Sequence, residues 1–393
     1  MTIGILGGGQ LGYMLALAGY PLGLRFRFLD PSPEAPVGRI AQRITAAFDD
    51  HSALDRFAAG LEAVTYEFEN VPVDTTRFLS QRVPVFPPSA ALEEAQHRVR
   101  EKNLFQKLAI ATTGFAPVPT PDDLDAALKK IPLPAILKTC RMGYDGKGQW
   151  ILRTPEDVAR AKSDLSSEHL DSAKNEAALI LERFVPFSRE LSIIAVRSRS
   201  GETAFYPLIE NHHRCGILRL SIAPAPRLSP ALQQAAEVAA RSILETLNYV
   251  GVLCIEFFEV QGRLLANEMA PRVHNSGHWT IEGAVTSQFE NHLRAILDLP
   301  LGSTAAPSPC AMLNLIGDVP DPREALALPD AHLHLYGKES RPGRKLGHLT
   351  IRAADFDALR QRLAALPKFF HRPEFCLEAL SPTTAPAVSP ATH

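Results

Sequence analysis

The sequence predicts an α/β protein of two to three domains that opens with a parallel sheet covered by helices. The chain has 393 residues, of which 46% are hydrophobic and 21% are charged, which is typical of a globular protein with several buried cores. Short apolar runs alternate with helical segments in the N-terminal part, as in parallel α/β sheets. Near residue 260 a β-hairpin pattern is followed by closely spaced polar side chains, and we expect a functional site there.

The first strand and helix enclose a glycine-rich turn. Strand Thr2 to Leu6 leads into Gly7-x-Gly9-x-x-Gly12, and a helix runs from Leu11 to about Ala18. A second strand, Arg25 to Leu29, ends in Asp30, about where dinucleotide-binding folds place a ribose-binding acid. Taken alone, this pattern suggests an NAD-dependent oxidoreductase. It is weak support, because any tight turn that holds a phosphate or a carboxylate at a helix N-terminus needs the same glycines.

The alternation of strands and helices continues to about residue 86. Strand Ala63 to Glu67, a helix after Pro72 and strand Val83 to Phe86 complete the predicted parallel sheet. Glu69 follows the carboxyl end of one of these strands, where open α/β sheets bind ligands. We therefore regard Glu69 as a candidate substrate-binding residue, with an exposed loop charge as the alternative.

A second glycine-rich segment lies between two predicted strands. Helices Ala90 to Val99 and Lys102 to Ala109 and a stiff linker at Pro117 to Pro121 precede it. Strand Ala135 to Thr139 and a returning strand from Trp150 are then joined by a loop with three glycines and a lysine. The backbone amides of such a loop can wrap phosphate oxygens. The loop lacks the Lys-Ser/Thr pair that ends a P-loop, so we predict a flexible flap over a phosphate.

The hairpin near residue 260 brings two acidic residues together. A long apolar run ends at Val260 and returns from Leu264 after a three-residue turn with a central glycine. If Val260 pairs with Leu264, Glu256 lies directly opposite Glu268, and two carboxylates roughly 5 Å apart repel by about 3 kcal/mol. Three interpretations stay open: the strands pair differently and the acids are solvated, one acid is protonated, or a hard cation such as Mg²⁺ lies between them.

Polar residues are crowded just beyond the hairpin. They are Asn267, Arg272, His274, Asn275, Ser276 and His278. The pattern of Glu256, Glu268 and Arg272 resembles the metal-binding hairpin of the ATP-grasp superfamily, in which two acidic residues hold Mg²⁺ on the ATP phosphates. The run from Asn267 to Trp279 is similar to the ATP-dependent 5-(carboxyamino)imidazole ribonucleotide synthetase family of purine biosynthesis. The chain has Ala270 where many superfamily members carry an asparagine.

The resemblance implies an architecture and a reaction. The implied ATP-grasp fold has a Rossmann-like domain at 1–96, an ATP-grasp domain at 97–305 with a flap subdomain at about 115–185, and a small C-terminal domain at 306–380. The tail at 381–393 is rich in Pro, Ala, Ser and Thr, and we expect it to be disordered. The implied ligase uses ATP and Mg²⁺ to convert 5-aminoimidazole ribonucleotide and bicarbonate, through carboxyphosphate, into the N5-carboxylated ribonucleotide, ADP and phosphate. The family commonly forms homodimers.

The resemblance also implies a set of site residues at the positions that match the family. The implied metal ligands are Glu256 and Glu268. The ATP-binding positions are Arg98, Lys138, Gly143, Tyr144, Asp145, Gly146, Lys147, Gly148, Gln149, Glu182, Arg183, Phe184, Val185, Glu190, His213, Asn267 and Glu268. The substrate-binding positions are Gln10, Glu69, Arg272, His274, Asn275, Ser276, Lys338, Arg344 and Lys345. The catalytic positions are Arg272, Asp145 and Tyr144.

A basic run follows in the C-terminal part of the chain. Lys338, Arg341, Arg344 and Lys345 place four cations within eight residues. Such a run is most often a solvated loop, but it is also the best place in a slightly acidic protein to hold a phosphate monoester. The resembled family uses matching residues for the ribonucleotide phosphate.

Charge and cysteine content exclude several other classes. A formal net charge of −2 gives no reason to expect a nucleic acid or an anionic membrane as partner. No apolar run reaches the roughly 18 to 20 residues that span a bilayer, so we expect a cytoplasmic protein. The five cysteines form no CxxC pair, which argues against a disulfide framework and a zinc site. The adjacent His212 and His213 do not indicate zinc either, because neighbours on a strand point to opposite faces.

Three alternatives compete with the implied function. A formate-dependent glycinamide ribonucleotide transformylase has the same fold, but it is expected to show His-Asp-Thr-Gly where this chain has His274 to Gly277. A nicotinamide oxidoreductase would bind NAD and would not turn over ATP. A nucleotide sensor would bind ATP without releasing ADP.

Overall fold

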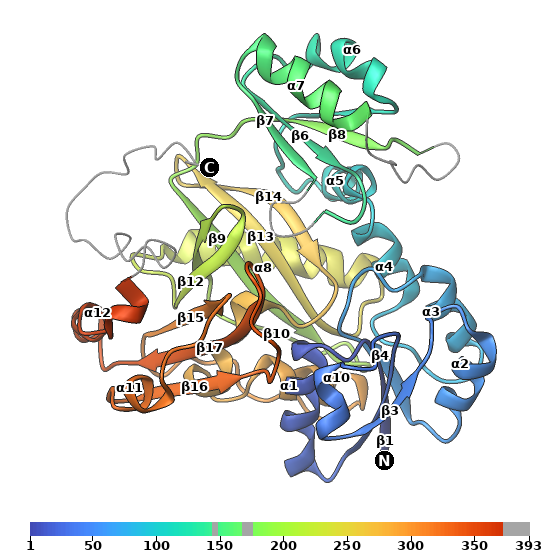
Figure 1. Ribbon diagram of the computed structural model, residues 1–393, viewed down its shortest axis with the longest axis vertical. Coiled ribbons are helices and arrows are strands. Elements are labelled where there is room, and N and C mark those ends of the chain that lie inside the picture. The colour runs from blue at the N-terminus through green and yellow to red at the C-terminus, as the bar shows by residue number, and fades with distance from the viewer. Residues whose placement is uncertain (144–147, 167–175, 372–393) are drawn as a thin grey trace.

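Three β-sheets organise the molecule (Figure 1). The computed structural model describes residues 1–143, 148–166 and 176–371, so Tyr144 to Lys147 and the tail at 381–393 lie outside the described residues. Figure 1 shows the N-terminal sheet and the C-terminal strands on either side of the lower part and the flap sheet above them. The hairpin of β13 (Gly251–Val260) and β14 (Arg263–Ala270) lies between these parts.

The N-terminal sheet is parallel, as predicted, with the strand order β3-β2-β1-β4. Its strands are β1 (Thr2–Leu6), β2 (Arg25–Asp30), β3 (Gln42–Thr45) and β4 (Ala63–Tyr66), and the helices around it are α1 (Gln10–Gly19), α2 (His51–Ala58) and α3 (Val73–Ser80). The predicted strand Val83 to Phe86 is wrong, because only Val85 forms an isolated bridge, to Val64. Pro84 has no N–H to donate, which interrupts a ladder at that point.

Two short helices connect the N-terminal sheet to the rest of the molecule. They are α4 (Ser89–Ala95) and α5 (Arg98–Lys107), so the first predicted helix ends earlier and the second begins earlier than expected. The Gln96 side chain lies between them and donates to the carbonyls of Glu69 and Val71 at 2.8 and 2.6 Å. Arg98 therefore lies in the first turn of α5 instead of near the end of the first predicted helix.

The flap sheet is antiparallel and has the strand order β5-β8-β6-β7. Its strands are β5 (Phe115–Val118), β8 (Leu179–Arg183), β6 (Ala135–Thr139) and β7 (Gln149–Leu152), with α6 (Leu124–Leu128) and α7 (Pro155–Ser166) packed on it. The prediction of a stiff linker from Pro117 is therefore wrong in part, since Pro117 belongs to β5. A proline is tolerated there because β5 is an edge strand of the flap sheet.

The central sheet is antiparallel and unites the middle and the end of the chain. Its order is β14-β13-β9-β11-β12-β15-β17-β16, with β10 on β9. Besides the hairpin, its strands are β9 (Arg189–Arg197), β10 (Thr203–Phe205), β11 (Ile209–Arg214), β12 (Ile217–Ala223), β15 (Cys310–Ile316), β16 (Ala331–Leu335) and β17 (Lys345–Arg352). The pairing of β12 with β15 continues the sheet into the C-terminal strands. The surrounding helices are α8 (Pro230–Thr246), α9 (Thr280–Gly283), α10 (Gln288–Ile296), α11 (Pro322–Leu326) and α12 (Phe356–Ala364).

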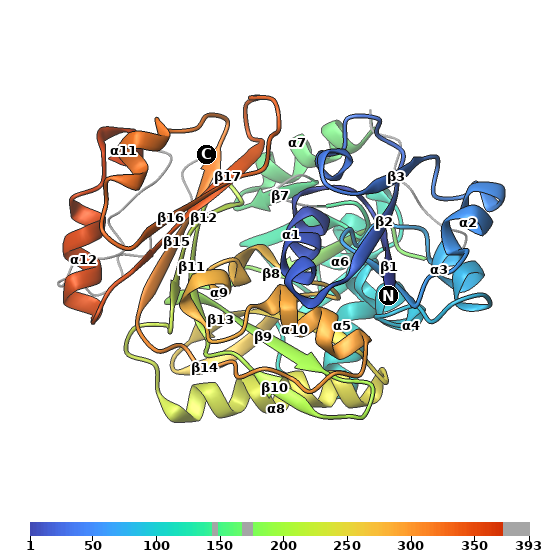
Figure 2. The ribbon, with the colours of Figure 1, turned by 90° about the horizontal axis from the view of Figure 1, so that it is seen from below.

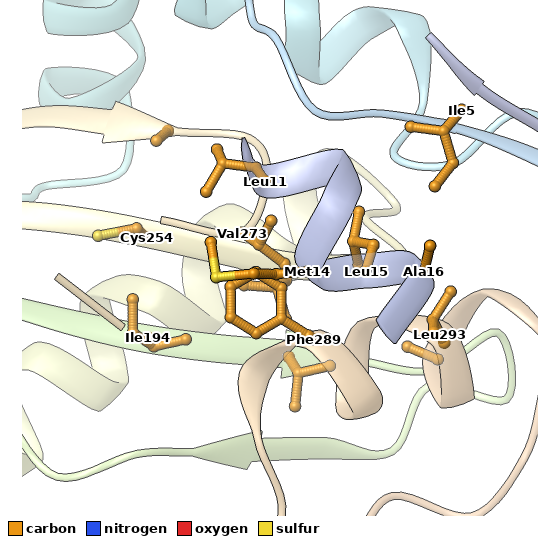
Figure 3. Close-up of a cluster of buried hydrophobic side chains, with 14 of the residues drawn as sticks. Ile5, Leu11, Met14, Leu15, Ala16, Ile194, Cys254, Val273, Phe289 and Leu293 are labelled. Atoms are coloured by element: carbon orange, nitrogen blue, oxygen red, sulfur yellow. The ribbon is translucent and has the colours of Figure 1, made fainter. Parts of the chain in front are cut away.

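Helices pack on both faces of β9 and β13. Helix α8 covers one face, against Leu253 and Ile255, whereas α1 and α10 cover the other face, which carries Ile194 and Cys254 (Figures 2 and 3). Each fully buried leucine or isoleucine contributes about 1.5–3 kcal/mol to such packing. Because alternate residues share a face, Glu256 lies on the same side as Cys254 and α1. The N-terminal helix is thereby held next to the predicted site.

Candidate active site

The two hairpin glutamates face each other, although not for the expected reason. Val260 pairs with Arg263, not with Leu264, across a two-residue turn in which Gln261 and Gly262 have φ of 50° and 75°. A register shift before Glu268 then restores the pairing of Glu256 with Glu268. Without this β-bulge, Glu256 would face position 267 and Glu268 would lie on the other side of the sheet. The interpretation in which a different pairing keeps the two acids apart is therefore wrong, because Glu256 and Glu268 are direct partners.

The acid pair has an unequal electrostatic environment. Burial and the neighbouring Glu268 raise the pKa of Glu256 to about 7. Burial also opposes ionisation of Glu268, but Arg98 and Lys138 outweigh it and hold its pKa below the usual value. Arg98 Nη1 lies 2.8 Å from Glu268 Oε2. Near neutral pH, Glu256 is therefore ready to take up either a proton or a cation, which leaves the two remaining interpretations in place.

A buried ion cluster joins the flap sheet to the acid pair. Glu182 on β8 lies 2.7 Å from Lys138 Nζ on β6 and 3.6 Å from Lys102 Nζ on α5. Lys102 Nζ also donates to the carbonyl oxygen of Asn267 on the hairpin at 2.7 Å. Lys102 was not among the predicted site residues, because a lysine within a polar helix gives no sign in the sequence that it is buried. It is 1% exposed.

The loop after β14 holds the predicted substrate end of the site. Arg272 forms an ion pair with Glu69, so the two candidate residues meet across domains. His274 Nε2 lies 3.5 Å from Glu256 Oε1. Burial and the charge of Arg272 hold the pKa of His274 well below its usual value, and the ring is therefore neutral. Asn275, in the same loop, has both amide atoms buried without a partner among the described residues. Such atoms are available to a ligand.

The basic run reaches the same region from the C-terminal strands. Lys338 Nζ contacts Gln10 Oε1, which joins residues 328 positions apart in the sequence. Burial lowers the pKa of Lys338, and the nearby Arg344 and Lys345 add to this effect. Arg344 Nη1 also donates to the carbonyl oxygen of Glu339 at 3.3 Å. The loop therefore brings its cations, together with Gln10, to the rim of the site near α1.

The glycine-rich turn before α1 is filled by the protein itself. Glu67 Oε1 accepts from the backbone N–H of Gly9 at 2.7 Å, and Glu67 Oε2 accepts from those of Leu11 and Gly12 at 3.1 and 3.0 Å. A Cβ on Gly9 would lie 2.6 Å from Glu67 Oε1. The carboxylate thus takes the place that a pyrophosphate takes in a dinucleotide-binding fold, which argues against NAD. The sequence placed Glu67 only at the end of a predicted strand, although an acid at the carboxyl end of a strand was the available signal.

The predicted nucleotide side lies between the flap sheet and β9. His213 Nδ1 is 2.5 Å from Glu190 Oε2; burial opposes protonation, but Glu190 outweighs it and raises the pKa of His213 to about 9. The predicted connection from Glu182 to Val185 is continuous with β8 and leads to β9. Its backbone is fixed where Arg183 N donates to Gly114 O at 2.8 Å.

The ends of the glycine-rich loop also contact this region. The carbonyl oxygen of Gly143 accepts from Arg98 at 3.4 Å. Gln149 pairs with Lys138 at the start of β7, and Gly148 has a φ of 65° that favours glycine. Met142 also has a positive φ, 59°. Tyr144 to Lys147, which include two predicted catalytic residues, lie outside the described residues.

The donor set of the acid pair fits Mg²⁺. Glu256 and Glu268 offer carboxylate oxygens from facing positions, which are hard ligands. Within residues 1–143, 148–166 and 176–371, no group of three or more His, Cys, Asp or Glu side chains could hold a metal by itself. A cation at this pair would therefore complete its shell with phosphate oxygens and water, which is how Mg²⁺ binds in nucleotide sites.

Comparison with known proteins gives matches along nearly the whole chain. Residues 1–96 match the ribonucleotide synthetase preATP-grasp domain, 103–289 the ATP-grasp domain, and 310–362 the phosphoribosylaminoimidazole carboxylase C-terminal domain. The N5-carboxyaminoimidazole ribonucleotide synthase of Pseudomonas aeruginosa is 53% identical over 364 residues, which cover 93% of this chain and 98% of that protein.

Solved structures show the same similarity. The crystal structure of N5-carboxyaminoimidazole ribonucleotide synthetase from Thermus thermophilus has 58% identity and a TM-score of 0.86, and the match covers 92% of this chain and 96% of that one. The Aspergillus clavatus synthase in complex with ADP and 5-aminoimidazole ribonucleotide has 31% identity and a TM-score of 0.85, with 94% and 98% covered. The predicted ATP-grasp fold with an N-terminal parallel sheet is confirmed. Among the described residues, no helix has the length and apolar character needed to cross a membrane.

Proposed function

The chain belongs to the N5-carboxyaminoimidazole ribonucleotide synthase family of ATP-grasp ligases, and on this premise we propose that it carboxylates 5-aminoimidazole ribonucleotide with bicarbonate in purine biosynthesis. ATP is the energy source, and ADP and phosphate are released. The observation that carries the assignment of the site is the pairing of Glu256 with Glu268 on one face of the hairpin, next to Arg98 and Lys138.

The chemistry needs an activated one-carbon unit, because bicarbonate is a poor electrophile. An oxygen of bicarbonate attacks the γ-phosphorus of ATP, the bond to the β-phosphate oxygen breaks, and ADP and carboxyphosphate form. Carboxyphosphate releases CO₂ and phosphate, and the exocyclic amine of the ribonucleotide attacks CO₂ and loses a proton. When bound, Mg²⁺ would neutralise charge on the β- and γ-phosphate oxygens. Arg272 is proposed to stabilise charge on the group being transferred.

The other residues divide between the two ends of the site. Lys138, Glu190 and His213, with the connection from Glu182 to Val185 and the glycine-rich loop from Gly143 to Gln149, are proposed to bind the nucleotide. Closure of that loop would exclude water from carboxyphosphate, and Tyr144 and Asp145 belong to this proposal as residues of the bicarbonate end.

The ribonucleotide is proposed to bind between α1 and the loop after β14. Lys338, Arg344 and Lys345 would hold its phosphate, with Gln10 and Glu69 beside them. The support for this arrangement is the direct contact of Lys338 with Gln10 and of Arg272 with Glu69. His274, Asn275 and Ser276 face the reacting amine and bicarbonate in this proposal.

A coupled ADP assay tests the function. ADP formation should require both 5-aminoimidazole ribonucleotide and bicarbonate, and should not occur with glycinamide ribonucleotide and formate. ADP formation with glycinamide ribonucleotide and formate would instead identify the transformylase. ATP binding without ADP release would indicate a sensor. Glu268→Ala should abolish turnover, since it removes one of the two carboxylates proposed to bind Mg²⁺. A Glu268→Ala variant with full turnover would refute the metal assignment.

A homodimer in the cytoplasm completes the proposal. The family membership supports both, and Leu17, Tyr20 and Leu22 expose apolar surface along α1 and the turn after it. Light scattering after gel filtration should give twice the mass of the 42.9 kDa chain. A monomer at micromolar concentration would contradict the proposed dimer without affecting the reaction.

A further inference from the structure

A buried chain of hydrogen bonds crosses the central sheet and ends at His274. Ser221 Oγ donates to Asn211 Oδ1, Asn211 Nδ2 donates to Ser192 Oγ, and Ser192 Oγ donates to Ser276 Oγ, each at 2.8 Å. Ser276 Oγ lies 2.9 Å from His274 Nδ1. Three strands and the loop after β14 are thus joined by one continuous polar path.

The polar residues of this path are placed where packing alone favours apolar ones. Ser192, Ser221 and Ser276 are fully buried and Asn211 is 3% exposed. The other buried residues of β9 and β12, which carry Ser192 and Ser221, are mainly Ile, Leu, Val and Ala. A buried hydroxyl or amide without a partner costs about 1–3 kcal/mol, and even a satisfied one gains little over an apolar side chain. Fold stability therefore gives no reason for this arrangement, and a role at the end of the path does.

The end of the path determines which nitrogen of His274 carries the proton. The backbone N–H of Ser276 donates to His274 Nδ1 at 3.3 Å, so Nδ1 acts as an acceptor and the proton of the neutral ring is on Nε2. The backbone of His274 is held from both sides by Gln288, whose Oε1 accepts from its N–H at 3.0 Å and whose Nε2 donates to its carbonyl oxygen at 2.6 Å. The ring thus has a fixed position and a fixed tautomer.

The strand register places the path next to the acid pair. Ser192 on β9 is the direct partner of Glu256 on β13, and Glu256 is the partner of Glu268 on β14. Directly paired residues share a face of the sheet, so the hydroxyl of Ser192 and the two carboxylates lie on the same side. His274 Nε2 is on this side too, 3.5 Å from Glu256 Oε1.

We propose that Ser192, Asn211 and Ser221 are positioning residues that hold His274 in its Nε2–H form, with this N–H directed into the site beside Glu256. The inference rests on the proposed function, because there the N–H of His274 serves as a hydrogen-bond donor to the oxygens of bicarbonate and of carboxyphosphate. The three residues touch neither substrate nor nucleotide, and they act through Ser276 and His274.

Nitrogen NMR of the full-length protein labelled with ¹⁵N-histidine tests the tautomer without any substrate. The signals of His274 are identified by their absence in His274→Gln. We expect Nδ1 to show the chemical shift of an unprotonated nitrogen and Nε2 that of a protonated one. In Ser192→Ala these signals should shift or broaden, because Ser276 loses its donor. A proton on Nδ1, or His274 signals unchanged in Ser192→Ala, would overturn the proposal.

Steady-state kinetics test whether the path acts through His274. Ser192→Ala should lower kcat about tenfold, the usual range for partners that orient an active-site ligand, with the KM for ATP unchanged within about twofold. Added to His274→Gln, the same substitution should lower the remaining kcat by less than about twofold, because the residue that it positions is gone. An equal loss in both backgrounds would show a general structural effect and overturn the proposal.

Ser198→Ala provides the matched control. Ser198 follows the same strand β9, is 1% exposed, and its hydroxyl bonds Ser200 Oγ at 2.8 Å, but it lies outside the path. It should change neither the kcat nor the NMR signals of His274. Wild-type protein that forms no ADP with 5-aminoimidazole ribonucleotide and bicarbonate would refute the proposed function, whereas an active enzyme with the proton on Nδ1 would refute this inference alone.

Discussion

Replacing Glu182 by glutamine tests the buried ion cluster that joins the flap sheet to the central sheet. Glu182 is 2% exposed and lies 2.7 Å from Lys138 Nζ and 3.6 Å from Lys102 Nζ. Burial opposes ionisation of Glu182, but Lys102 and Lys138 outweigh it and lower its pKa from 4.5 to about 2. This shift corresponds to about 3 kcal/mol in favour of the folded state with the carboxylate charged. The amide also leaves two buried lysines without their acid.

Urea unfolding as a function of pH measures this contribution. At pH 7, Glu182→Gln should lower the free energy of unfolding by about 3 kcal/mol. Because the folded-state pKa of about 2 is below the unfolded value of 4.5, the contribution is complete above about pH 4.5 and is lost as the pH falls toward 2. The difference between wild type and variant should therefore narrow over that range.

An exposed glutamate provides the control for this experiment. Glu245 lies on the exposed side of α8, so Glu245→Gln should change the free energy of unfolding by less than about 0.5 kcal/mol at every pH. A Glu182→Gln variant as stable as wild type at pH 7 would refute the reasoning. So would a loss of stability that stays constant from pH 7 to pH 2.

Substitutions elsewhere have equally specific outcomes. Glu67→Gln should lower the free energy of unfolding in urea by about 1–2 kcal/mol, since an amide cannot accept from all three N–H groups of the glycine-rich turn. An unchanged midpoint of urea unfolding would contradict the role of Glu67 as the cap of α1. His213→Gln should lower the free energy of unfolding by about 1–2 kcal/mol at pH 7, where His213 is charged beside Glu190. This loss should vanish as the pH rises through about 9, where the imidazole of the wild type becomes neutral. The same loss at pH 10 would argue against the charged pair. Lys338→Ala should raise the KM for 5-aminoimidazole ribonucleotide about tenfold or more, because a charge-assisted hydrogen bond is worth about 1.5–3 kcal/mol. The control Arg341→Gln should leave this KM within about twofold. An equal rise in KM for both variants would mean that only the net charge of the loop matters.

The acid pair shows how a sequence prediction can be correct for an incomplete reason. The facing of Glu256 and Glu268 was predicted from a three-residue turn and a regular ladder. The structure has a two-residue turn and a β-bulge, and the two differences cancel. A bulge leaves no clear sign in a single sequence, because it depends on what the extra residue contacts. Here the carbonyl oxygen of Asn267 accepts from the buried Lys102.

Contacts between distant segments were the main features that the sequence did not predict. Glu67 was predicted only as the end of a strand, and Lys102 only as part of a helix. In the structure Glu67 fills the glycine-rich turn and Lys102 joins Glu182 to the hairpin. Both are ordinary polar residues within their local pattern. Their roles depend on which groups lie beside them after folding, and neither periodicity nor turn chemistry contains that information.

The sequence by itself determined the elements with short-range causes. The parallel N-terminal sheet, the strands of the hairpin and the family motif from Asn267 to Trp279 follow from alternating apolar residues, turn glycines and a contiguous run of residue types. Tertiary structure alone decided the bulge, the capping of α1 by Glu67 and the hydrogen-bonded path to His274. The physical reason is that a buried charge or hydroxyl is stabilised only by its partners, and in this protein those partners come from other strands and helices, often far away in the chain.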